Sequence, residues 1–243
     1  MNKPLNRDAI KYIAMVTMLL NHIANIFIPT GVWIGEVFIS VGYFTAITML
    51  YFLVEGYEYT HSKKKYLARL LIFGLISEIP YCIALTNEGI ISFRGFDMIF
   101  TLALCFGLIW FLDTHEKKWM KFLASVVAVV LSVFCDWALM APIITLLFIW
   151  SKHSEKKIRI AYLLSAALFG ILSFLGGMEH FSFVQNVIFA VLAMMGMVAS
   201  GICILHLYNG KRAEKGKTFS KWFFYLFYPA HLLVLGIIRI SLL

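Results

Sequence analysis

The fold class is decided by one stretch, IKYIAMVTMLLNHIANIFI at residues 10–28. Apart from Lys11 near its start it carries no Asp, Glu, Lys or Arg, and it is long enough to span a bilayer as a helix. Apolar runs of about 17 to 22 residues recur along the chain. Only 14% of the residues are charged, where a soluble domain usually has about 25%. The pattern predicts an all-α integral membrane protein.

We expect about nine transmembrane helices in a single polytopic membrane domain over residues 1–243. The fifth and sixth helices are separated only by Asp136 and Trp137, and the sixth is short enough to be re-entrant. The first helix is expected to be retained, because no small-x-small cleavage pattern follows it. The predicted spans are 10–28, 35–55, 66–86, 96–112, 119–135, 137–150, 158–176, 186–207 and 222–242.

The basic residues predict the orientation of these helices. When the connections are assigned alternately to two sides, one side holds 19 of the 21 Lys and Arg residues, and the other holds Arg94 and Arg239. Short cytoplasmic loops are enriched in Lys and Arg, so the N-terminus is predicted to be cytoplasmic and the C-terminus external. The net charge of +8 is explained in this way without a nucleic-acid partner.

The four cysteines lie in or beside apolar runs and have no metal-ligand spacing. They are Cys82, Cys105, Cys135 and Cys203. We interpret them as small core residues and predict no metal site. A disulfide between Cys82 and Cys135, both expected near the outer face, stays open as an alternative.

Ionisable side chains inside a membrane span are costly, so each is a candidate functional residue. Four qualify here: His22, Glu55, Glu78 and His231. Asp97 and Asp136 are expected at external helix ends, where water can reach them and a structural role is favoured.

Lys11 and His22 fall on one face of the first predicted helix. Eleven residues at 100° each return to within roughly 20° of the same direction, and they separate the two side chains by about 16 Å along the axis. This places Lys11 at the cytoplasmic rim and His22 beyond the middle of the membrane. A phosphate-bearing donor could bind Lys11 while His22 acts as a general base. Alternatively, His22 is a packed histidine and Lys11 an interfacial anchor.

The second and third spans carry further candidates. Glu55 is expected near the cytoplasmic end of the second span, at the depth of a basic cluster, where it can serve as an interfacial ion-pair partner. Alternatively, the cluster binds donor phosphates, although the charge bias alone can explain its lysines. Glu78 precedes Pro80 well inside the third span. The basic cluster consists of Lys63, Lys64, Lys65 and Arg69.

The later candidates are Asp136 and three residues of the ninth span. Asp136 can orient His22 or an acceptor, or simply serve a short loop. Tyr225, Tyr228 and His231 follow at spacings of three around Pro229, so they either line a groove or form an aromatic belt with a packed histidine.

The chain resembles the TraX family, named for the conjugation protein that acetylates the N-terminus of F-type pilin. The resemblance runs nearly end to end. The segments that carry it are RDAIKYIAMVTMLLNHI (7–23), FLVEGYEYTHSKKKYLARLLIFGLISEIPY (52–81), FDMIFTLAL (96–104), CDWALMAP (135–142) and FYLFYPAHLLVLG (224–236).

The resemblance implies roles for particular residues. Lys11 and His22 are similar to a pattern of the wider transmembrane acyltransferase group, a basic residue followed after ten residues by histidine. Asp136 and His231 lie in further family segments and are expected to be catalytic with His22. One departure is Asn21, because TraX-like proteins usually have Asp before the histidine, and an amide cannot supply charge.

The sequence therefore predicts an acyltransferase, with acetyl-CoA as donor, in the bacterial cytoplasmic membrane. Lys11 and the basic cluster would bind the donor phosphates, and Glu78, Asn21, Asn25 and Tyr228 would contact the acceptor. The acceptor is a pilin-like peptide amine, a glycan or a small molecule, and membrane lipid is the other expected partner. A transporter or channel using His22, Glu78 and His231 is the main alternative, and a nonenzymatic assembly factor is a third.

Overall fold

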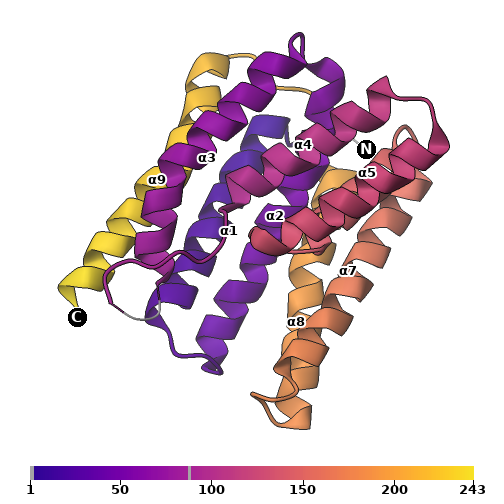
Figure 1. Ribbon diagram of the computed structural model, residues 1–243. Helices are drawn as coiled ribbons and strands as arrows, with labels where there is room; N and C mark the ends of the chain where they lie inside the picture. Colours follow the sequence, from indigo (N-terminus) through magenta and orange to yellow (C-terminus); the bar gives the residue numbers. More distant parts are fainter. Residues whose placement is uncertain (1–2, 87–88) are drawn as a thin grey trace. The chain divides into compact units, whose positions relative to one another are not determined.

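The apolar runs fold as helices because a segment in lipid must satisfy its own backbone hydrogen bonds. The computed structural model describes residues 3–86 and 89–243, and within these it has nine α-helices and no β-strand (Figure 1). The prediction of an all-α chain is confirmed. The helices are α1 (Arg7–Phe27), α2 (Trp33–Tyr59), α3 (Lys63–Leu85), α4 (Met98–Thr114), α5 (Lys118–Leu131), α6 (Met140–Ser151), α7 (Glu155–Gly177), α8 (Phe183–Ile202) and α9 (Lys217–Ser241). A short 3₁₀ turn, η1 (Ser132–Phe134), follows α5, and a π-helical turn, η2 (Cys203–Leu207), extends α8.

Six of these helices are long and apolar enough to cross a membrane. They are α1, α2, α3, α7, α8 with η2, and α9. The other three are shorter, with 17 residues in α4, 14 in α5 and 12 in α6. At 1.5 Å per residue, α5 and α6 are only about 21 and 18 Å long, less than the roughly 30 Å hydrocarbon layer.

Several helices begin where the sequence places a polar cap. Asn6, Ser62, Asp97 and Ser154 each accept a hydrogen bond from the backbone N–H three residues ahead. Such caps satisfy donors that have no partner inside the helix. They fix the first residues of α1, α3, α4 and α7.

The helices group into two compact units. Unit 1 comprises residues 1–49 and 151–227, and unit 2 comprises residues 50–150 and 228–243, so α2 and α9 each contribute to both. In unit 1, α7 and α8 run side by side (Figure 1). In unit 2, α3 packs against α4 and α4 against α5.

Unit 1 is held by small residues and hydroxyl pairs between continuous helices. A Cβ on Gly196 of α8 would lie 1.9 Å from the Ser40 carbonyl oxygen of α2, so the two backbones touch there. The Thr48 and Ser200 hydroxyls bond at 2.7 Å across the same pair of helices. Small residues and buried hydroxyls of this kind are typical of helix contacts in membranes.

The four cysteines are free. Cys82, Cys105 and Cys203 are buried, as expected of small core residues, and Cys135 is half-buried.

Candidate functional site

In unit 1, α1 runs without a break from Arg7 to Phe27, so the predicted alignment of Lys11 and His22 on one face is retained. Eleven residues of α-helix separate them by about 16 Å. His22 is buried, with 8% of its surface exposed, and is one of seven buried residues of α1. The Lys11 ammonium lies 5.2 Å from the ring centroid of Phe224 in α9. The charged Lys11 near the start of α1 and the buried imidazole of His22 therefore lie on the same face of one helix.

Asn21 joins α1 to α2 beside His22. Its Nδ2 donates to the Ile39 carbonyl at 2.9 Å, and Asn25 Nδ2 donates to Asn21 Oδ1 at 2.9 Å. A Cβ on Gly42 would lie 2.2 Å from the Asn21 Cβ, so α2 offers room only for a glycine there. An aspartate could not donate to Ile39, which gives the amide at position 21 a structural reason. Asn25 is exposed.

In unit 2, residues 89–96 fold back along the last part of α3, so α4 does not begin level with the end of α3. The backbone N–H of Asp97, the residue before α4, donates to Glu78 Oε2 at 3.1 Å. Glu78 lies seven residues before the end of α3, which corresponds to about 10 Å along its axis. The N-terminus of α4 therefore lies beside α3 about two turns before its last residue.

Asp97 is the centre of this junction, and the expectation that it is a hydrated helix end is wrong. Its side chain is fully buried, caps α4 through the Phe100 N–H at 2.9 Å, and accepts a hydrogen bond from the Ser77 hydroxyl of α3. A helix that starts inside the bundle exposes donors to a dry environment, so a buried acceptor is required. The only signal in the sequence was an Asp just before an apolar run.

The connection between α5 and α6, residues 132–139 (the tip), lies beside the start of α4. Phe96 pairs with the backbone of this tip, since its N–H donates to Phe134 and its carbonyl accepts from Asp136 at 2.8 and 2.7 Å. Asp136 is half-buried and accepts the Thr101 hydroxyl at its own carbonyl, at 2.7 Å. The predicted two-residue connection is thus longer than expected, because residues 135–139 are not helical.

The backbone of the tip is conformationally strained. Trp137 and Leu139 have φ values of 59° and 62°, in the left-handed region that costs a non-glycine residue roughly 1–2 kcal/mol. Such residues persist where their surroundings over-determine them, often at functional sites.

Tyr228 and His231 of α9 belong to the same unit. The Met98 N–H lies 3.4 Å from the Tyr228 hydroxyl, so Tyr228 helps to cap α4. The His231 ring lies 5.8 Å from that of Tyr228 and is buried, with 8% exposed. Within unit 2 the structure thus gathers Glu78, Asp136, Tyr228 and His231, four predicted site residues, around Asp97.

The basic cluster lies at the start of α3. The Lys63 ammonium donates to the carbonyls of Tyr57 and Thr60, the end of α2, and lies 3.9 Å from the Tyr57 ring centroid. The Arg69 guanidinium is 5.5 Å from the Tyr66 ring centroid, and Lys64 and Lys65 are exposed. Lys63 therefore has a structural role at a helix end, which the sequence did not reveal.

Glu55 is half-buried in the last turns of α2. No three His, Cys, Asp or Glu side chains gather into a metal-binding group among residues 3–86 and 89–243.

Comparison with known proteins gives two matches. A family model described as "TraX protein" matches residues 6–239. The relative "Probable fimbrial assembly protein FimC, serogroup H1" of Dichelobacter nodosus is 31% identical over 239 residues, which is 93% of this chain and 92% of that protein. No solved structure matches the chain significantly.

Proposed function

Because the chain belongs to the TraX family, we propose that it is a membrane-embedded acyltransferase that moves an acetyl group from cytoplasmic acetyl-CoA to an amine or hydroxyl. A relative named as a fimbrial assembly protein supports an acceptor among the components of surface filaments, such as a pilin amine. A glycan and a small molecule are the alternative acceptors. The membrane is the bacterial cytoplasmic membrane.

The observation that carries this proposal is the geometry of α1. Lys11 and His22 share one face of a continuous helix, about 16 Å apart, and His22 is buried. Lys11 binds a phosphate of the donor at the cytoplasmic rim, and His22 meets the reactive end deeper in the membrane. As a separate part of the proposal, the basic cluster of unit 2 also binds donor phosphates. It consists of Lys63, Lys64, Lys65 and Arg69.

In the reaction, the neutral imidazole of His22 accepts the proton of the acceptor amine or hydroxyl. The acceptor nitrogen or oxygen attacks the thioester carbonyl, the C–S bond breaks, and the proton passes to the departing CoA thiolate. Alternatively, His22 attacks first and carries the acetyl group before the acceptor takes it. Asp136 and His231 are assigned catalytic roles with His22, and Glu78, Asn21, Asn25 and Tyr228 are assigned to the acceptor.

We also propose that the N-terminus is cytoplasmic and the C-terminus external, with nine membrane helices. The bias of 19 basic residues to one side supports this orientation. Because α5 and α6 are short, they form a hairpin that enters from the cytoplasmic side and returns to it, which leaves the alternation unchanged.

The test uses purified protein in detergent with candidate acceptors. Acetyl-CoA should raise the thermal midpoint of the wild type, and CoA release should depend on the acceptor. His22→Gln should lower the transfer rate at least about 100-fold because the base is removed, while the thermal midpoint stays unchanged. His180→Gln, at an exposed histidine between α7 and α8, is the matched control.

A folded His22→Gln protein that transfers acetyl groups at the wild-type rate would disprove the assignment. A transporter or channel using His22, Glu78 and His231, the main alternative, should show neither stabilisation by acetyl-CoA nor CoA release.

A further inference from the structure

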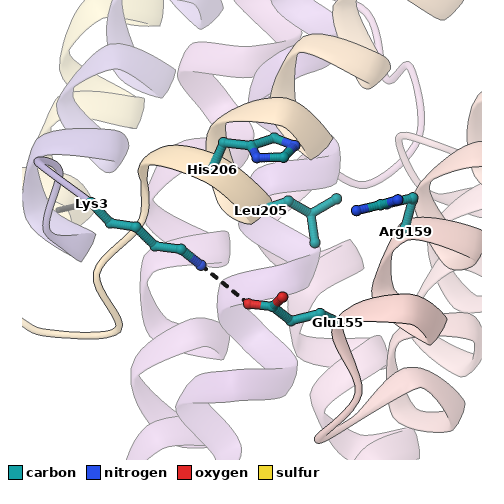
Figure 2. A pocket seen from close by; sticks show the side chains of 5 residues that line it. All are labelled: Lys3, Glu155, Arg159, Leu205 and His206. Atoms are coloured by element: carbon teal, nitrogen blue, oxygen red, sulfur yellow. Dashed lines mark hydrogen bonds and ion pairs between the residues drawn. The ribbon is translucent and has the colours of Figure 1, made fainter. Parts of the chain in front are cut away.

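Unit 1 has a hollow of about 200 Å³ on the side predicted to be cytoplasmic. It is lined by Lys3, Glu155, Arg159, Leu205 and His206, and Figure 2 shows their side chains converging on it. The residues come from three parts of the chain: the N-terminal segment, the start of α7, and η2. The bias of positive charge toward the cytoplasm explains basic loops, but it does not require their side chains to meet in a concave site.

Lys3 is fixed at the hollow by its backbone and by an ion pair. The Leu5 N–H donates to Leu207 and the Asn209 N–H donates back to Leu5, both at 2.9 Å, so the N-terminal segment is paired with the chain after α8. The Lys3 ammonium lies 3.2 Å from Glu155 Oε1. The N-terminal segment is thereby part of the folded unit, and its lysine reaches the hollow through an exposed ion pair.

The other two basic side chains are placed by helix geometry. His206 lies in the π-helical turn, which is closed by a 3.0 Å bond from the Tyr208 N–H to the Cys203 carbonyl. Turns of this kind are rare and are frequent at functional sites. Arg159 lies in the second turn of α7, near the helix end whose dipole favours anions.

The charges of the hollow select for an anion. Lys3 and Arg159 are cationic, His206 adds an imidazole that can donate a hydrogen bond, and Glu155 is the one acidic group in the lining. A volume of about 200 Å³ is below the usual 300–1,000 Å³ of sites that enclose a whole drug-sized ligand, so it suits one charged group of a larger molecule. An arginine fork is well matched to phosphate oxygens.

We propose that this hollow binds a phosphate group. Where that group belongs to the CoA donor, this proposal rests on the proposed function. The same chemistry is offered by the headgroup of an anionic phospholipid. Arg159 is the main ligand, Lys3 and His206 add to it, and Glu155 holds Lys3 in the absence of the anion while opposing anion binding.

The test compares three substitutions in full-length protein. Arg159→Gln should weaken CoA binding about tenfold, because a charge-assisted hydrogen bond is lost. Lys156→Gln removes the same charge from the same helix outside the hollow and should change the dissociation constant less than about twofold. Glu155→Gln should tighten binding about twofold, since it removes a negative charge from the lining.

Two arms distinguish the sources of phosphate. The first measures CoA and 3′-dephospho-CoA in nanodiscs of phosphatidylcholine. The second measures retention of phosphatidylglycerol by native mass spectrometry. A loss on Arg159→Gln in the first arm identifies the donor, and a loss confined to the second identifies a lipid headgroup. Either result supports a phosphate site.

Equal effects of Arg159→Gln and Lys156→Gln in both arms would overturn the site. A loss with Glu155→Gln as large as that with Arg159→Gln would also overturn it, because the hollow would then depend on the ion pair and not on positive charge. If the wild type binds no CoA at all, the proposed function fails, and the lipid arm alone decides the phosphate site.

Discussion

The two units meet the demands of a membrane on the polypeptide backbone in different ways. In unit 1, helices such as α1 and α7 are continuous, so their backbone groups are satisfied internally and polar side chains are used between helices. In unit 2, α4 begins beside α3 before that helix ends, and buried side chains must satisfy the first turn of α4. A buried polar side chain therefore links neighbouring helices in unit 1, whereas in unit 2 it must also satisfy the backbone at a helix end.

This difference bears on the assignment of catalytic residues. Asp97 and Tyr228 accept hydrogen bonds from the first turn of α4, and Asp136 is paired through its backbone with Phe96, so a loss of activity on their substitution can follow from a loss of structure. His22 lies within a continuous helix and not at a helix end that needs a capping side chain. A loss at His22 with unchanged stability is therefore the cleaner evidence for chemistry.

The largest effect on stability is expected in unit 2, at the cap of α4. Asp97→Ala removes the cap of α4 and leaves the buried Ser77 hydroxyl without its carboxylate, so we expect a loss of about 2–4 kcal/mol. Thermal unfolding in detergent measures the loss, and hydrogen exchange should locate it in the first turn of α4. Asp97→Asn, which keeps the cap, should lose less than half as much. A wild-type midpoint for Asp97→Ala would show that the junction does not need its cap.

The next effect tests the close packing of unit 1. Gly196→Ala places a methyl group 1.9 Å from the Ser40 carbonyl oxygen, so α8 must move away from α2 at a cost of about 1–3 kcal/mol. In the control Gly176→Ala the new methyl group meets nothing within 4 Å, and the higher helix propensity of alanine should leave stability equal or slightly raised. Equal midpoints for both variants would contradict direct backbone contact between α2 and α8.

The smallest effect concerns a single hydroxyl between continuous helices. Thr45 Oγ1 donates to the Ala14 carbonyl at 2.5 Å and lies 2.7 Å from the Thr17 hydroxyl. Thr45→Val should cost only about 0.5–1.5 kcal/mol, because α1 keeps its own backbone bonds. Thr218→Val, at an exposed position in the first turn of α9 and in the same unit, serves as control and should be neutral. A loss for Thr45→Val as large as that for Asp97→Ala would remove the distinction between the units.

The sequence predicted the helices better than the ends where they meet. Apolar runs placed α1 at 10–28 and α7 at 158–176, within three residues of the structure, because hydropathy and length report directly on burial in lipid. Hydropathy does not report how deep a helix begins. The fold-back before α4 and the non-helical tip at 135–139 depend on contacts between segments far apart in the chain, such as Asp97 with Glu78.

The candidate site shows the same division. The alignment of Lys11 with His22 depends only on helical periodicity and was predictable. The structural use of Lys63 at the end of α2 and of Asn21 against Ile39 was not, since each depends on a partner backbone whose position the sequence does not give. Arg159 and His206 were not predicted as site residues, because Arg159 follows the predicted charge bias and His206 lies at the very end of the predicted span 186–207.

The pairing of the N-terminal segment with the chain after α8 also sets an order for biosynthesis. Leu5 can bond to Leu207 only after some two hundred further residues have been made, which at roughly 5–20 residues per second takes about 10–40 s. Through that interval the ribosome adds the whole of residues 50–150 while the segment before α1 waits for its partner, although α1 itself can already pair with α2. Translation therefore completes the surroundings of Lys3 late, and a nascent chain released before α9 would lack the last part of unit 1.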